Sequence, residues 1–427
     1  DLDVSGFSGP VDLGVDADGD PPAFDSLSST GSHGVGQTVS IILAANEDLV
    51  SGGSATLDLD IGGNTRTASF DRIDGTGNAV FEYTITASDV NDSNGIEVTG
   101  LTNAGDLVDD FGQSLTGVPT SNQPLAATVE VDAPSVDGIT GTAGSTLTAG
   151  DTVTITLDAS EDLVDPGGAA PSLSLDVGGS TETATFSGIT SGDATFTYTV
   201  ANGNLDSNGI EVTAVQNPGD LTDAAGNDLD VSGFTSINLS GITVDAQTPT
   251  PTVSATSGPL VEGDTLTVTL DAGKTLQNPT GTPTLTLDIG GVSKTATLDA
   301  VSGSEARFTY TVQSGDLDSD GIAIDSVTIA PGEITDTAGN DLDTSGLVGT
   351  MLTGTTVDAA APMFASVNTV ASGAVAAGDT VEIMLSATEA LNGPGSSASL
   401  DLKVGSATET VSFDRIEGGD AVFKYTV

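Results

Sequence analysis

The chain has 427 residues, of which 61 are Asp or Glu and only 8 are Lys or Arg, giving a formal net charge of −53. Nucleic acid and anionic membrane surfaces would repel such a chain, which excludes both as partners and leaves cations as its natural counter-ions. The sequence has no run of 18 apolar residues and no Cys, so we expect neither a membrane span nor disulfides.

The sequence repeats itself about every 113 residues. The tripeptide Val-Asp-Ala recurs at intervals of 116, 113 and 113 residues, with its aspartate at Asp16, Asp132, Asp245 and Asp358. A Phe-x-Tyr motif recurs in the same phase, with its phenylalanine at Phe81, Phe196, Phe308 and Phe423. Two different motifs that recur with the same period indicate tandem domains.

The phase of the repeat predicts the domain boundaries. Residues 1–17 correspond to the C-terminal strand or strands of a preceding repeat, because residues 1–7 match residues 228–234. Three complete repeats follow, and the fourth is incomplete. They span residues 18–133, 134–246, 247–359 and 360–427. The sequence is then a window from a longer array, or alternatively the open fourth repeat is completed by a strand of a neighbouring copy.

Short strands are predicted along each repeat, most clearly along the second. After a first strand near residues 135–140, apolar and polar residues alternate strictly over 152–159, as in a half-buried strand. A hairpin follows, because Gly178-Gly179 readily adopts the positive φ of a tight turn. Its two strands and the later ones span residues 172–177, 181–186, 194–200, 209–215 and 237–244.

About seven short alternating strands in each repeat, without helical periodicity, predict an all-β fold of tandem immunoglobulin-like β-sandwich domains of about 113 residues. The hairpin glycines recur in the first and third repeats as Gly62-Gly63 and Gly290-Gly291. A β-solenoid or another β module is the alternative.

An acidic segment precedes the sixth strand of each complete repeat. Oxygen-bearing side chains on alternate residues, followed by Gly, are typical of the first half of a calcium loop, although the closing glutamate of an EF-hand is missing. The alternative is a turn in which these side chains cap local backbone groups. The candidate calcium ligands in the second and third repeats are Asn204, Asp206, Asn208, Asp316, Asp318 and Asp320.

A second set of carboxylates lies where one repeat joins the next. Linker aspartates follow the last strand of each repeat, and a Glu-Asp loop follows the second strand, although the third repeat has Lys274-Thr275 there. Carboxylates at a junction would share a cation and stiffen it; the alternative is that they form solvated turns. These candidates are Asp16, Asp18, Asp20, Asp132, Asp245, Asp358, Glu161 and Asp162.

A third phrase, Asp-x-x-Gly-Asn, begins at Asp223 and at Asp336 and is altered at Asp109. We interpret it as a tight turn, which would also be placed to donate ligands to a site formed with an adjacent loop.

The sequence gives little basis for catalysis. Its one histidine, His33, lies in a Gly/Ser-rich stretch and has no counterpart in the other repeats. There is no Cys nucleophile, and the Ser residues have no neighbouring base. We therefore expect that the protein is not an enzyme.

Residues 150–157, 171–179, 196–200, 206–210 and 221–227 resemble the bacterial Ig-like repeats of giant secreted adhesins and other extracellular surface or filament proteins. The resemblance covers essentially the whole chain, in the phase of the internal repeat. It implies sandwiches that act as extenders at the cell surface, with calcium bound in loops or at joints. Neighbouring repeats, or other copies in an assembly, are then the partners.

Two functions compete: a structural extender, or an adhesive module that recognises a glycan or protein through loops at one end of the sandwich. Aromatic residues make up 4% of the chain, and the Phe/Tyr pairs alternate into the predicted core, which favours the extender. The acidic surface of a protein from a high-salt habitat would have the same composition without a specific metal site. We predict that calcium raises the unfolding temperature and reduces bending between domains.

Overall fold

The computed structural model describes residues 19–427 apart from 145, 166, 278, 371–372 and 394–396, so the predicted strands in residues 1–17 lie outside the described part. The chain divides into two compact units, Asp1–Gln247 and Thr248–Val427. The described residues form β-strands joined by turns, with two single-turn 3-10 helices and no α-helix. The short helices are Ala104–Asp106 and Pro218–Asp220.

In the first repeat, a seven-stranded sheet has the order β1-β3-β6-β5-β4-β7-β8. Strand β5 pairs with β4 through residues 64–69 and with β6 through residues 69–73, so it belongs to both layers of a sandwich. A parallel pair, β2 and β9, lies apart from this sheet. The strands are β1 (Phe24–Ser28), β2 (Thr30–His33), β3 (Thr38–Ala45), β4 (Thr56–Ile61), β5 (Asn64–Ile73), β6 (Ala79–Thr84), β7 (Glu97–Thr102), β8 (Gln123–Pro124) and β9 (Ala126–Val129).

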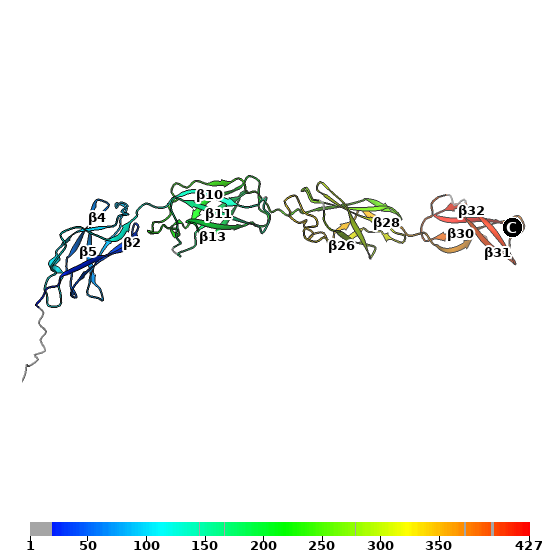
Figure 1. The fold of residues 1–427 in the computed structure, drawn as a ribbon. Helices are drawn as coiled ribbons and strands as arrows, with labels where there is room; N and C mark the ends of the chain where they lie inside the picture. Colours follow the sequence, from blue (N-terminus) through cyan, green and yellow to red (C-terminus); the bar gives the residue numbers. More distant parts are fainter. Residues whose placement is uncertain (1–18, 145, 166, 278, 371–372, 394–396) are drawn as a thin grey trace, which may run out of the picture. The chain divides into compact units, whose positions relative to one another are not determined.

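The second repeat, in which Figure 1 labels β10, β11 and β13, has an equivalent sheet. Its strand order is β10-β11-β14-β13-β12-β16-β17. Strand β13 passes between the layers at a bulge near Phe186, which bends it. Strands β15 and β18 form a small separate pair. The strands are β10 (Val136–Thr142), β11 (Thr152–Ala159), β12 (Ser172–Val177), β13 (Ser180–Thr190), β14 (Asp193–Thr199), β15 (Leu205–Asp206), β16 (Ile210–Gln216), β17 (Ile237–Leu239) and β18 (Val244–Asp245).

The second unit contains the third repeat, whose sheet has the order β19-β21-β24-β23-β22-β26-β27. A smaller sheet, β20-β28-β25, joins the acidic segment to the end of the repeat. The strands are β19 (Thr252–Ala255), β20 (Gly258–Leu260), β21 (Thr265–Asp271), β22 (Thr284–Ile289), β23 (Val292–Ser302), β24 (Glu305–Thr311), β25 (Leu317–Asp318), β26 (Ile322–Thr328), β27 (Met351–Leu352) and β28 (Thr355–Asp358).

The fourth repeat consists of one five-stranded sheet, β29-β30-β33-β32-β31, with a smaller core than the others. Phe364 and Val367 on β29 are 61% and 62% exposed, so this strand has an apolar surface that no other described strand covers. The strands are β29 (Phe364–Thr369), β30 (Thr380–Ala387), β31 (Ser399–Val404), β32 (Ala407–Glu417) and β33 (Asp420–Thr426).

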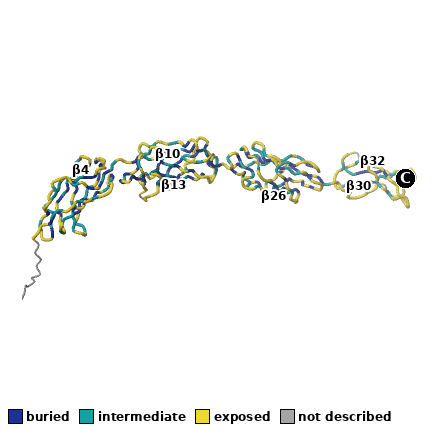
Figure 2. The backbone as a smooth tube through the Cα atoms, in the orientation of Figure 1, coloured by how far each residue is buried: buried dark blue, intermediate teal, exposed yellow. Residues whose placement is uncertain are grey.

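Buried residues alternate with partly buried or exposed ones along the strands, as the sequence pattern predicts (Figure 2). Among the described residues, the buried apolar side chains form four clusters, one within each repeat. Phe81, Phe196 and Phe308 are fully buried at equivalent positions. Because each cluster draws on both layers of its own repeat, burial of these faces stabilises each repeat from within.

The fold is all-β and built from sandwiches, as predicted, and in the second repeat the strand at residues 152–159 and the hairpin at Gly178-Gly179 are found at the expected positions. The strand predicted over residues 237–244 is instead broken. Strand β17 pairs with β16, the chain turns at Ser240-Gly241, and β18 pairs with β15. The sequence pattern does not reveal this break, because apolar residues continue on both sides of it although β17 and β18 pair with different strands.

Candidate functional site

One aspartate of each acidic segment ties that segment to the hairpin glycines. Asp206 is 3% exposed, and its Oδ2 accepts the backbone N–H of Gly178 at 2.9 Å. Its Oδ1 accepts the N–H groups of Asn208 and Gly209 at 3.0 and 2.9 Å. Both oxygens are therefore used within the second repeat, as in an Asx turn that also fastens a neighbouring hairpin.

The third repeat makes the same bonds. Asp318 Oδ2 accepts the N–H of Gly290 at 2.8 Å, while Oδ1 accepts those of Asp320 and Gly321 at 3.2 and 2.8 Å. In both repeats the first hairpin glycine is essential to this contact: a Cβ on Gly178 would lie 1.9 Å from the carbonyl oxygen of Leu205. The acidic segment and the hairpin are thus in direct backbone contact.

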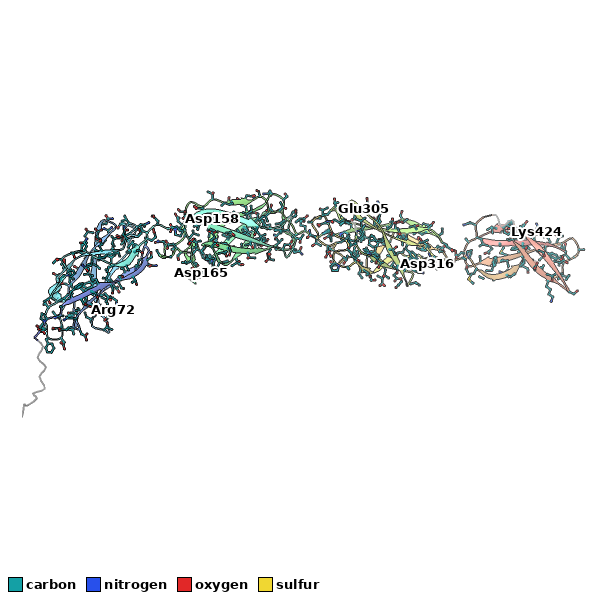
Figure 3. All side chains as sticks on the ribbon, viewed as in Figure 1. Arg72, Asp158, Asp165, Glu305, Asp316 and Lys424 are labelled. Carbon is teal, nitrogen blue, oxygen red and sulfur yellow. The ribbon has the colours of Figure 1, made fainter. Side chains whose placement is uncertain are left out.

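The first polar residue of each acidic segment is buried beside a tyrosine and a residue of the hairpin's second strand. Tyr310 donates to Asp316 Oδ2 at 2.6 Å, and Lys294 Nζ lies 2.7 Å from Asp316 Oδ1 (Asp316 is labelled in Figure 3). Burial alone would raise the pKa of Asp316, but the bonds from Lys294, Tyr310 and Gln313 outweigh it and lower that pKa. The carboxylate is therefore ionised and internally neutralised.

In the second repeat, different residues occupy the positions of Asp316 and Lys294. Tyr198 donates to Asn204 Oδ1 at 2.7 Å, and the amide nitrogen of Asn204 donates to Glu182 Oε1 at 3.0 Å. Glu182 and Lys294 occupy equivalent strand positions, four residues after the first hairpin glycine. Where the strand residue is acidic, the buried partner is the neutral Asn204, so none of the three complete repeats pairs two carboxylates there.

The side chains of Asn204, Asp206, Asp316 and Asp318 therefore form structural bonds, which supports the turn interpretation of the acidic segments. Asn208 and Asp320 are exposed, and their backbone N–H groups belong to the same turns. Calcium binding at this segment stays a prediction.

The linker aspartates lie at the same end of their repeat as the acidic segment. Asp245 is paired with Leu205 in the β15–β18 ladder, and Asp358 is paired with Leu317 in the β25–β28 ladder. In the first repeat the amide of Asn91 donates to Asp132 Oδ2 at 2.8 Å. Asp16 and Asp18 lie outside the described residues, and the backbone oxygen of Asp20 accepts Gln113 Nε2 at 3.2 Å.

Within the first unit, hydrogen bonds join the first two sandwiches. Asn227 Nδ2 donates to the carbonyl oxygens of Glu130 and Asp132 at 2.9 and 3.2 Å, and its Oδ1 accepts the N–H of Val35 at 2.9 Å. The N–H of Gly34 donates to the carbonyl of Ala225 at 2.8 Å. One side chain of the second sandwich thus contacts both the linker and a loop of the first.

Carboxylates gather around this joint. Burial and the nearby charges of Glu130, Asp223 and Asp132 raise the pKa of Glu161, in that order. Asp162, the other acidic residue of this loop, is exposed and lies against the β13–β14 turn, where a Cβ on Gly192 would be 2.2 Å from its Oδ1. Of the two predicted loop residues, only Glu161 therefore faces the linker charges.

The Asp-x-x-Gly-Asn phrases, interpreted from the sequence as tight turns with a second role as ligand donors, have first aspartates that are among the most buried charged groups. Their exposed fractions are 3%, 4% and 1% for Asp109, Asp223 and Asp336. The only signal for them in the sequence is the recurrence of the phrase in phase with the repeat. Among the described residues, no group of three or more His, Cys, Asp or Glu is arranged to hold a metal ion.

No family model and no curated protein matches this sequence. Among solved structures, the chain is similar to the full extracellular region of Plexin A4, with 12% identity and a TM-score of 0.18 over 74% of this chain. The match covers 33% of the Plexin chain, so this chain spans about a third of that structure. In the described part of the chain, no helix is long and apolar enough to cross a membrane.

Proposed function

We propose that this chain is a structural extender segment, a stalk or filament-forming part of a large extracellular surface protein, which calcium stiffens at its joints. The observation that carries the proposal is the hydrogen-bonded joint between the first two sandwiches, centred on Asn227. A side chain that bonds both the linker and the neighbouring sandwich restricts bending, which is what an extender requires.

The distribution of apolar residues supports the same function. Each complete repeat has its own core, so force or length is transmitted through independently stabilised units. The partners are then neighbouring repeats of the same chain or other copies in an assembly. No catalytic activity enters this proposal.

Calcium fits the joint by its donor chemistry. Glu161, Asp223 and Asp132 are carboxylates within one electrostatic neighbourhood, and oxygen ligands are those that Ca²⁺ prefers. The raised pKa of Glu161 means that its negative charge is unfavourable there without a counter-ion. A bound cation would remove that penalty and hold the linker against the second sandwich.

The proposal is tested by calorimetry and small-angle X-ray scattering of the full chain in EGTA at low ionic strength and, at one higher matched ionic strength, in calcium chloride, in magnesium chloride and in sodium chloride with EGTA. We expect calcium to raise the unfolding temperature and to narrow the distribution of interdomain distances relative to EGTA. If sodium chloride alone reproduces both effects, the acidic surface needs only charge screening and the calcium part is wrong. If neither quantity changes with any cation, the stiffening part is wrong as well.

A further inference from the structure

The first aspartate of the Asp-x-x-Gly-Asn turn occupies the same place in three repeats, as Asp109, Asp223 and Asp336. In each, Oδ1 faces into the turn and accepts the backbone N–H four residues later, at 2.8, 2.9 and 2.9 Å. In the third repeat the other oxygen, Oδ2, meets Lys274 from the loop that follows the second strand. The three repeats differ in what neutralises this second oxygen.

In the third repeat, the neutralising group is an ammonium. Lys274 Nζ lies 3.1 Å from Asp336 Oδ2, with side-chain exposures of 26% and 2%, and Asn340 Nδ2 donates to the same oxygen at 3.1 Å. Burial would raise the pKa of Asp336, but the bonds from Asn340 and Lys274 lower it. The carboxylate is ionised and paired without any external ion.

In the second repeat, the position of Lys274 is taken by Glu161, and Asp223 Oδ2 accepts only the neutral amide of Asn227 at 2.8 Å. The loop of the second repeat therefore has a carboxylate at the sequence position where the third repeat has the ammonium of its ion pair.

In the first repeat, the equivalent loop residue is Glu47, and Gln113 replaces the turn asparagine. The amide of Gln113 donates to the backbone oxygen of Asp20 at 3.2 Å rather than to Asp109. Asp109 Oδ2 is buried and has no hydrogen-bond partner, and it is the only such side-chain atom among the described residues. A buried carboxylate oxygen without a donor carries a large desolvation cost unless a cation meets it.

We propose that Lys274 is a built-in counter-ion that stands in for a divalent cation, so that the first and second repeats take a hard divalent cation at Asp109 and Asp223 and the third does not. This inference rests on the calcium-stiffened extender proposed above and states which of its repeats respond to the cation. The chain is then stiffened unevenly, with a cation-independent third repeat.

Peptide-resolved hydrogen exchange of the full chain tests this, in EGTA and in calcium at about ten times the dissociation constant. Cation binding to the folded state slows exchange through local opening by about tenfold under these conditions. We expect that slowing in residues 107–116 and 221–229, and no change in residues 334–342. Equal slowing in all three turns would overturn the role of Lys274 and leave the proposed function intact, whereas no slowing anywhere would overturn both.

Two reciprocal substitutions sharpen the test. Lys274→Glu should transfer the calcium-dependent slowing to residues 334–342, and Glu47→Lys should abolish it in residues 107–116. Lys403→Glu, an identical charge change at an exposed site in the fourth repeat, is the matched control and should leave all three turns unchanged. If Lys274→Glu unfolds the third repeat in calcium as well as in EGTA, the outcome of Glu47→Lys decides: a calcium response that persists there overturns the proposal.

Discussion

Tyr310 donates a hydrogen bond of 2.6 Å to the buried carboxylate of Asp316, whose other oxygen lies 2.7 Å from the ammonium of Lys294. The second repeat keeps the tyrosine bond but replaces the ion pair by Glu182 and Asn204. The two residues at this place therefore differ together between the second and third repeats, so that neither repeat puts two carboxylates there, and each pair holds the acidic segment against the hairpin.

Lys294→Met should lower the unfolding temperature of the third repeat, because it leaves the ionised Asp316 buried without its cation. Adding Asp316→Asn should recover much of the loss, since a neutral amide is what the second repeat has there. Lys403→Met, at an exposed position, is the control. Thermal melts of the four chains check this, and a double variant no more stable than Lys294→Met would show that the ion pair is not the cause.

Gly178→Ala and Gly179→Ala form a matched pair of variants. Both glycines have positive φ, 60° and 91°, but only a Cβ on Gly178 meets backbone, at 1.9 Å from Leu205 O. A non-glycine residue in left-handed conformation costs about 1–2 kcal/mol, so Gly179→Ala should lose about that much. Gly178→Ala should lose clearly more and also accelerate amide exchange in residues 205–210. Equal losses in urea unfolding would contradict the contact between hairpin and acidic segment.

Asn227→Ala should loosen the joint in the first unit. The N–H of Val35 loses its acceptor, and the carbonyls of Glu130 and Asp132 lose their donor. We expect faster amide exchange at residues 33–37 and a broader scattering-derived distance distribution. Asn340→Ala, the equivalent change in the third repeat, should leave exchange at residues 33–37 unchanged; if both variants behave alike there, Asn227 does not hold the joint.

Glu161→Gln should stabilise the second repeat in EGTA at neutral pH. The folded-state pKa of Glu161 is raised above its ordinary value of 4.5. The Glu161 side chain therefore adds to the free energy of unfolding only when it is protonated. That contribution is present below pH 4.5 and is lost as the pH rises through the raised value. The advantage of the variant should therefore disappear on acidification.

Thermal melts of Glu161→Gln between pH 3 and pH 7 measure this, with the exposed Asp162→Asn as control. The same variant should respond less to calcium, because it removes one of the carboxylates around the linker. A constant difference across the pH range would contradict the electrostatic origin.

The sequence by itself determined the period, the all-β class and most strand positions, because alternation with period two and a Gly-Gly turn are local signals. It also located the acidic segments at Asp206 and Asp318, although it left two roles open for them. Their use as backbone clamps depends on Gly178 and Gly290, each 28 residues away, which approach only when the layers fold together.

Only the tertiary structure decided which carboxylates meet which partners. With 61 acidic residues, nearly every turn of this chain looks like a possible ligand loop, and sequence spacing does not distinguish an oxygen that caps an N–H from one that faces another charge. The bond from Asn227 to Glu130 spans 97 residues, and that from Lys274 to Asp336 spans 62. Such pairs arise from packing across layers and joints, where burial makes each unpaired charge costly and so selects its neighbour.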